Sequence, residues 1–238
     1  ESGRFLAVLA SCGVVPGDRV FMQVEKSTEA VLLYLACLRA GAVFVPLNTG
    51  YTGSEIEYFL SDTRPALFVC RPEDEETVTL LAHKAGVEMV LSLGAEGDGS
   101  LMEAVREAQP RTSVEPCTTN DLAAILYTSG TTGRSKGAML THDNLLSNGL
   151  VLHEYWQWVE GDVLLHALPI FHVHGLFVAL HCALLNGSRI IFLDKFDVDR
   201  VVEELPKSTV LMGVPTFYVR LLEADGFDRD LCATMRLF

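Results

Sequence analysis

The sequence has 238 residues, of which 49% are hydrophobic and 21% are charged, a composition typical of a globular protein with a substantial buried core. Its formal net charge of −13 argues against nucleic-acid binding, which depends on basic surface that neutralises phosphates. The same charge opposes long-range attraction of an anionic substrate, so an anion has to be captured by local groups.

Short apolar runs alternate with helical patterns along the chain. This alternation predicts an α/β fold with mostly parallel sheets and helices on both faces. Helix starts are indicated by Ser27, by a capping box of Thr52 with Glu55, by Asp197 and by Pro215. The predicted strands are 19–24, 42–46, 66–70, 87–92, 122–127, 163–168, 189–193 and 208–213.

A polar stretch rich in Gly, Pro and Thr separates two predicted α/β subdomains. We expect an N-terminal subdomain at 1–93, a loop and linker at 94–120, and a second subdomain at 121–238. The second is expected to be incomplete, because Met235–Phe238 has the pattern of a strand that has only begun. Since the chain also lacks an initiator Met, we expect it to be part of a longer protein.

Residues 164–185 contain no Asp, Glu, Lys or Arg and are long enough to cross a membrane. They also contain Pro169, Gly175 and four histidines, which are costly in lipid. A buried strand, a functional loop and a buried helix are therefore expected instead of a membrane span. The six cysteines form no C-x-x-C pair, which is typical of reduced thiols in a cytoplasmic protein.

The segment Thr128–Gly137 carries the strongest functional signal. It combines hydroxyl side chains, glycines and two cations directly after the apolar strand predicted at 122–127. Glycines let backbone N–H groups approach an anion, while hydroxyls and cations add donors and charge. The segment therefore predicts a polyphosphate-binding loop, for which the candidate ligands are Thr128, Ser129, Gly130, Thr131, Thr132, Gly133 and Lys136.

A plain surface turn is the alternative interpretation of this segment, and Arg134 is either a further substrate contact or a solvated side chain. The segment is not a Walker A motif, because Lys136 is followed by Gly137 where that motif has Ser or Thr. A helix is expected to start within Ala138–His142.

The loop resembles the signature of the adenylate-forming superfamily, which includes acyl-CoA synthetases, luciferases and peptide-synthetase adenylation domains. The usual form of that signature has Pro where this chain has Ser135. Within the superfamily, the sequences His-Val-His-Gly-Leu and Met-Gly-Val-Pro-Thr-Phe-Tyr are most similar to malonyl-CoA synthetases. The similarity extends over most of the chain and includes Gly17–Val20, Cys37–Asn48, Leu168–Leu176 and Val210–Tyr218.

This resemblance implies an ATP-dependent acid–CoA ligase. Such an enzyme activates malonate or methylmalonate as an acyl-adenylate and transfers it to coenzyme A, with Mg²⁺ carried by ATP. It also implies that the adenine-, ribose- and magnesium-binding residues, and the catalytic Lys of a mobile C-terminal domain, lie beyond Phe238. The alternatives are an adenylation domain that loads a carrier protein, a CoA ligase for another small acid, and a nucleotide-binding fragment without turnover.

His172 is the candidate catalytic residue. It follows the strand predicted at 163–168, and ligands of parallel sheets bind beyond the carboxyl ends of strands. The resemblance places this position beside the acyl site, where it would contact the carboxylate or shape the access of CoA. A structural histidine bonded to a backbone carbonyl is the alternative, and it is the preferred interpretation of His174.

A zinc site formed by His172, His174 and His181 is disfavoured, because no Cys or carboxylate stands nearby at ligand spacing.

A malonate-specific site has to neutralise a second carboxylate. Arg is suited to this because its guanidinium matches a carboxylate in bidentate geometry. Arg220, in the helix expected after Pro215, is the candidate. The alternative is an ordinary surface arginine of that helix.

Overall fold

The strands that the structure describes form two sheets, one in each of two units. The computed structural model describes residues 1–128 and 134–238, with unit 1 formed by Glu1–Asp143 and unit 2 by Asn144–Phe238. Our expected second subdomain begins at residue 121, whereas unit 2 begins at 144. The reason is that the strands on either side of the candidate loop belong to the sheet of unit 1. The predicted α/β class with mostly parallel sheets is confirmed.

Unit 1 contains a six-stranded sheet in the order β4-β3-β1-β2-β5-β6, in which the first five strands are parallel and β6 is antiparallel. Each of the five predicted strands of this unit is present. The strands are β1 Arg19–Gln23, β2 Val43–Pro46, β3 Leu67–Cys70, β4 Met89–Ser92, β5 Leu122–Thr128 and β6 Lys136–Thr141.

We expected a helix to start within Ala138–His142, and it starts at the last of these residues, His142. Residues up to Thr141 form β6, and helix α6 begins at His142. The edge of β5 presents unpaired backbone groups, and the segment after the loop satisfies them by folding back as a strand. Local sequence pattern does not reveal this pairing.

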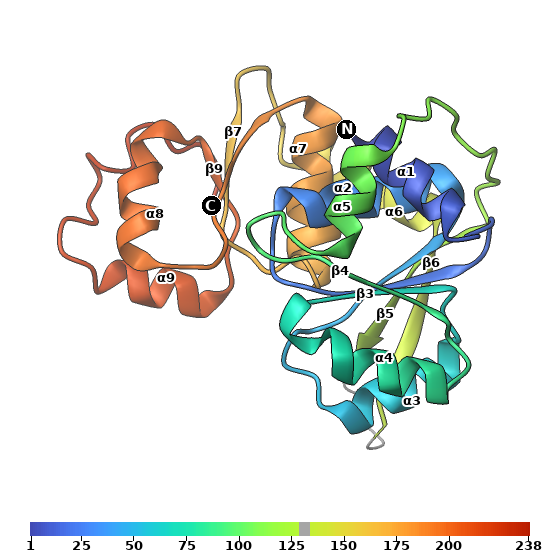
Figure 1. The fold of residues 1–238 in the computed structure, drawn as a ribbon. Helices are drawn as coiled ribbons and strands as arrows, with labels where there is room; N and C mark the ends of the chain where they lie inside the picture. The colour runs from blue at the N-terminus through green and yellow to red at the C-terminus, as the bar shows by residue number, and fades with distance from the viewer. Residues whose placement is uncertain (129–133) are drawn as a thin grey trace. The chain divides into compact units, whose positions relative to one another are not determined.

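Helices cover both faces of the sheet of unit 1. Figure 1 shows α3 and α4 on one side of the strands, and α1, α2 and α5 on the other. Ser27 caps α2, and the Thr52 N–H donates to Glu55 at 2.8 Å at the start of α3, as predicted. The helices are α1 Ser2–Ser11, α2 Thr28–Ala40, α3 Gly53–Thr63, α4 Glu75–Lys84 and α5 Ser100–Glu107, with a 3₁₀ turn at Pro72–Asp74.

Unit 2 contains a three-stranded parallel sheet in the order β8-β7-β9. Alternate residues of β7 point to opposite faces, so Leu164 packs toward α7 and Leu165 packs toward α8. The strands are β7 Val163–His166, β8 Arg189–Phe192 and β9 Val210–Leu211. The helices are α6 His142–Tyr155, which begins in unit 1, a π-helix at His174–Leu180 that continues as α7 His181–Asn186, α8 Val198–Glu204, a 3₁₀ turn at Leu205–Lys207 and α9 Pro215–Leu222.

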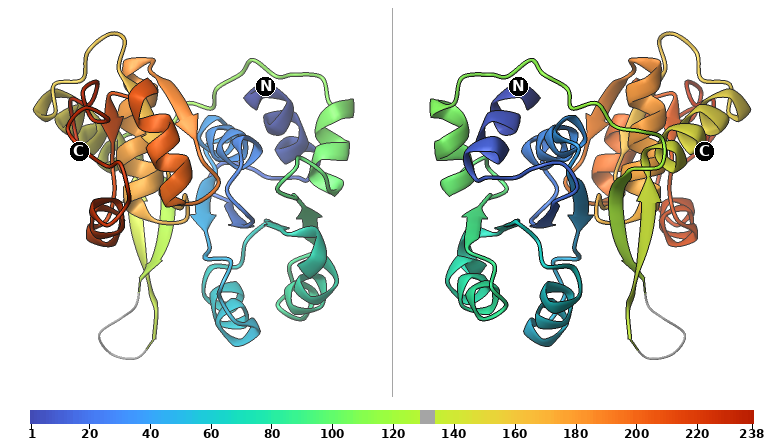
Figure 2. Two further views of the ribbon diagram at one scale, coloured as in Figure 1. Left: turned by 90° about the vertical axis from the view of Figure 1, so that its left-hand side faces the viewer. Right: turned by 90° about the vertical axis from the view of Figure 1, so that its right-hand side faces the viewer.

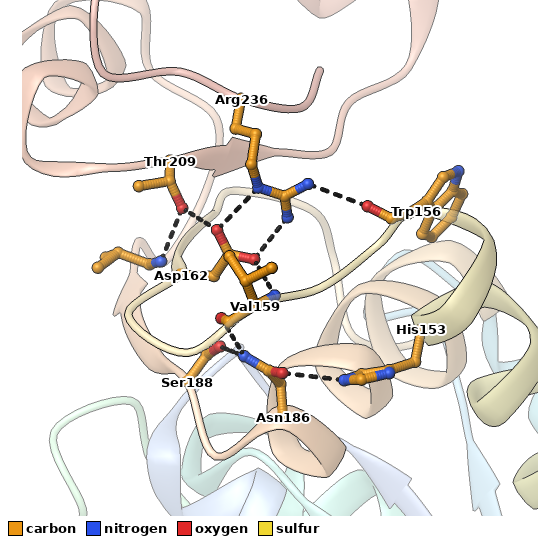
Figure 3. A network of polar contacts seen from close by, with 9 residues as sticks. His153, Trp156, Val159, Asp162, Asn186, Ser188, Thr209 and Arg236 are labelled. Atoms are coloured by element: carbon orange, nitrogen blue, oxygen red, sulfur yellow. Dashed lines mark hydrogen bonds and ion pairs between the residues drawn. The ribbon is translucent and has the colours of Figure 1, made fainter.

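The last residues of the chain are attached to the sheet of unit 2. Leu237 forms a parallel bridge with Val210 of β9, where we expected a strand to begin. Beside it, Arg236 reaches the buried Asp162 at the start of β7, and Asp162 also accepts a hydrogen bond from Thr209 at 2.8 Å (Figure 3). This polar network joins the ends of three segments that are distant in sequence.

The apolar stretch 164–185 forms most of β7, a loop, the π-helix and most of α7, which agrees with the expectation of a strand, a loop and a helix. Across residues 1–128 and 134–238, no helix combines the length and apolar character needed to cross a membrane.

Candidate functional site

The two flanks of the predicted phosphate loop face each other in unit 1. β5 and β6 run side by side (Figure 2), and their register ends with Thr128 opposite Lys136. The Thr128 hydroxyl donates to the Lys136 carbonyl oxygen at 3.4 Å, and both side chains are exposed to solvent. The hairpin therefore brings together one candidate hydroxyl and the candidate lysine. The predicted ligands Ser129, Gly130, Thr131, Thr132 and Gly133 lie outside the described residues.

The hairpin is anchored to α3 beside these residues. Tyr127, the last buried residue of β5, donates a hydrogen bond to Asp62 at 2.7 Å and lies against the Phe59 ring. Burial raises the pKa of Tyr127 further above neutral pH, where a tyrosine hydroxyl is already protonated and can donate. Arg134 is exposed and lies with Cζ 5.9 Å from the centre of the Tyr58 ring.

A second candidate region lies in unit 2, where β7 ends. A cavity of about 430 Å³ opens there, and its walls are mostly apolar. His172 stands on the loop after β7, as predicted, and His174 is the first residue of the π-helix. Both histidines line this cavity together with Leu168, Pro169, Gly175, Val214 and Phe217.

His172 and His174 provide polar groups in this apolar wall. Burial lowers the pKa of both imidazoles below the ordinary value, so both are neutral at pH 7. A neutral imidazole can donate one hydrogen bond and accept another, but it brings no positive charge to an anion. His174 also lines a cavity of about 220 Å³ with Tyr218 and Phe238. From the sequence, a structural role was the preferred interpretation of His174, whereas the structure places it in the walls of both cavities. Its spacing from His172 alone does not reveal the direction of its side chain.

The π-helix is held close to the loop that precedes it. The buried His166 of β7 makes a hydrogen bond of 2.9 Å with the Gly175 carbonyl oxygen. A Cβ atom on Gly175 would lie only 2.1 Å from the Pro169 carbonyl oxygen, so no larger residue fits without movement of the backbone. Gly175 thus allows the start of the π-helix to lie against the loop that carries Pro169.

Arg220 does not line the 430 Å³ cavity. It is exposed on α9, with Cζ 5.0 Å from the centre of the Phe196 ring. Phe196 in turn stacks on Phe217 at 3.8 Å between ring centres, and Phe217 lines the cavity. Arg220 is thus separated from the cavity by two aromatic rings in this structure, and its substrate role stays a prediction.

No group of three or more His, Cys, Asp or Glu side chains arranged to hold a metal ion occurs among the residues that the structure describes. His172, His174 and His181 accordingly do not converge on a common point there.

Comparison with known proteins identifies the chain's relatives. The family model described as AMP-binding enzyme matches residues 1–238. The mitochondrial malonate–CoA ligase ACSF3 of Mus musculus is 36% identical over 217 residues, which are 89% of this chain and 36% of that protein. The malonate–CoA ligase of Arabidopsis thaliana is 32% identical over 233 residues, which are 92% of this chain and 38% of that protein.

Solved structures give a closer match. The ATP-bound structure of MatB from Rhodopseudomonas palustris superposes with a TM-score of 0.97 at 50% sequence identity, covering 100% of this chain and 47% of that one. The chain thus spans less than half the length of these relatives. Because the family model matches every residue from the first to the last, the chain belongs to the AMP-binding enzyme family.

Proposed function

We propose that the protein containing this chain is an ATP-dependent acid–CoA ligase that acts on malonate or methylmalonate. The observation that carries the proposal is the 36% identity to a malonate–CoA ligase over 89% of this chain. The likeness of the whole chain to ATP-bound MatB, at 50% identity and a TM-score of 0.97, supports the use of ATP. The position of Thr128 opposite Lys136, both within the segment with the phosphate-binding pattern, supports the same activity.

In the proposed first step, a carboxylate oxygen of the acid attacks the α-phosphorus of ATP, and pyrophosphate leaves. Both reactants are anions, so catalysis requires positioning together with positive charge and hydrogen-bond donors at the leaving phosphates. The Lys136 ammonium and the Thr128 hydroxyl would supply these, with Mg²⁺ entering bound to ATP. The predicted ligands at 129–133, with Arg134, would complete the phosphate contacts.

In the second step, the thiol sulfur of coenzyme A attacks the acyl carbonyl carbon, and AMP leaves. We assign the histidine-lined cavity of unit 2 to the acid. His172 would contact the reacting carboxylate as a neutral hydrogen-bond donor, consistent with its lowered pKa. Because neither histidine is charged, neutralisation of the distal carboxylate falls to a cation, for which Arg220 is the candidate.

A cytoplasmic location is part of the same proposal. Cys37, Cys70 and Cys182 are buried free thiols, which behave as small apolar core residues in a reducing compartment.

Malonate-dependent exchange of labelled pyrophosphate into ATP, measured with the full natural chain, tests the first step. We expect exchange with malonate or methylmalonate that exceeds exchange with acetate or propionate. Equal exchange with all four acids would contradict the assigned substrate. Supplying CoA or a purified carrier protein as the acceptor then separates a CoA ligase from a carrier-loading adenylation domain.

A further inference from the structure

One face of helix α3 contacts β5 and the residue that directly precedes β6. Tyr58 and Asp62 are four residues apart on α3, so their side chains lie one above the other. Asp62 accepts a hydrogen bond from Tyr127 of β5 at 2.7 Å. One turn earlier, the Tyr58 hydroxyl donates to the Ser135 carbonyl oxygen, just before β6, at 3.0 Å. One helix face thus contacts Tyr127 and Ser135, which lie on either side of positions 129–133 in the sequence.

The Ser135 contact acts directly on Lys136. The Ser135 carbonyl belongs to the peptide group whose nitrogen is that of Lys136, so this hydrogen bond orients the peptide plane that enters Lys136. The carbonyl of Lys136 itself accepts from the Thr128 hydroxyl at 3.4 Å. The backbone of this lysine is therefore held from α3 on one side and from β5 on the other.

The Tyr58 ring is itself fixed. It packs against Phe59 at 5.6 Å and against Tyr127 at 6.4 Å between ring centres. Its face receives the Arg134 guanidinium at 5.9 Å, a distance at which a cation is attracted to an aromatic ring. One side chain thus contacts both residues that precede Lys136.

We propose that Tyr58 is a positioning residue for the cations Arg134 and Lys136, and that it tunes the affinity for the triphosphate of ATP without touching the nucleotide. The inference rests on the proposed function, in which these cations bind phosphate. A cation that is already oriented loses less conformational freedom when phosphate binds, so the tyrosine hydroxyl favours binding.

The test is Tyr58→Phe, which removes the hydroxyl and keeps the ring for Phe59, Tyr127 and Arg134. Tyr51→Phe is the matched control, since Tyr51 packs edge-on against the same Phe59 ring at 5.0 Å. Calorimetric titration of the full natural chain should show the Kd of ATP raised about three- to tenfold in Tyr58→Phe, the range expected for one neutral hydrogen bond. The Kd of AMP should change less than about twofold, because AMP lacks the β- and γ-phosphates.

A double variant shows whether the effect passes through the lysine. In a Lys136→Ala background, Tyr58→Phe should change the Kd of ATP less than it does in the natural protein.

An unchanged Kd of ATP in Tyr58→Phe, or equal weakening of ATP and AMP binding, would overturn the proposal. If the natural protein binds both nucleotides but lacks malonate-dependent exchange, the ligase assignment fails, and the ratio of ATP to AMP affinity still decides the role of Tyr58.

Discussion

Arg236 forms a two-point ion pair with Asp162, with Nε donating to Oδ1 at 3.1 Å and Nη2 donating to Oδ2 (Figure 3). A third donor, Nη1, reaches the Trp156 carbonyl oxygen at 3.0 Å. The Asp162 side chain is 2% exposed, whereas that of Arg236 is 33% exposed. The pair therefore attaches the C-terminal segment to the start of β7 through a buried carboxylate.

Asp162→Asn should lower the free energy of unfolding of unit 2 by about 2 kcal/mol at pH 7, because hydrogen bonds to charged groups contribute about 1.5–3 kcal/mol. Both tryptophans, Trp156 and Trp158, lie in unit 2, so denaturation followed by tryptophan fluorescence reports on this unit. Lys207→Ala, which removes an exposed pair with Glu204, is the control and should change stability by less than about 0.5 kcal/mol.

The Asp162 contribution should also depend on pH. Burial raises the pKa of its carboxyl, but Arg236, the Val159 amide and Thr209 outweigh burial and hold it below the ordinary value. A lowered pKa in the folded state means that the stabilisation is present above the unfolded value, about 3.9, and is lost as pH falls further. The difference between natural protein and Asp162→Asn should therefore shrink below about pH 4. A difference that stays constant from pH 7 to pH 3 would contradict this.

Gly175→Ala should destabilise unit 2 by about 2–3 kcal/mol, because overpacking against backbone forces the chain to shift. The added Cβ would meet the Pro169 carbonyl oxygen at 2.1 Å. Gly149→Ala is the control, since the nearest atom to its Cβ would be the terminal Cδ1 of Leu185 at 2.9 Å, which can rotate away. Equal fluorescence-monitored midpoints for the two variants would show that the π-helix tolerates movement.

Lys136→Ala should reduce kcat/KM for adenylation about 10- to 100-fold, the loss expected for one hydrogen bond to a charged phosphate. Pyrophosphate exchange in the full natural chain measures this. Lys84→Ala is the control, because Lys84 pairs with Glu57 on the surface of α3 and α4 at 2.8 Å. Matching rates for Lys136→Ala and the natural protein would remove Lys136 from the phosphate site.

Arg220→Ala should raise the KM for malonate much more than the KM for propionate, because only malonate carries a second carboxylate. Arg220→Lys should restore less than the full affinity, since an ammonium cannot reproduce bidentate geometry. If both acids are affected equally, Arg220 acts through its packing on Phe196 rather than on substrate charge.

Most strands can be predicted from the sequence, because the short apolar runs that favour a strand are also the segments that the fold buries. Strands such as β1 and β7 are short apolar runs, and Ser27 and Asp197 cap helices through hydrogen bonds within a few residues. By contrast, β6 was missed, because residues 138–141 have an apolar pattern compatible with a helix. Antiparallel pairing with β5 decides their conformation.

The same distinction applies to the candidate site. Residue type and spacing are enough to predict phosphate binding at Thr128 and Lys136, and the family resemblance predicts an acid-site role for His172. By contrast, tertiary folding brings Tyr58 to Ser135, 77 positions away, and Arg236 to Asp162, 74 positions away. Such contacts form between segments that folding brings together, and they leave no periodic signal in either segment.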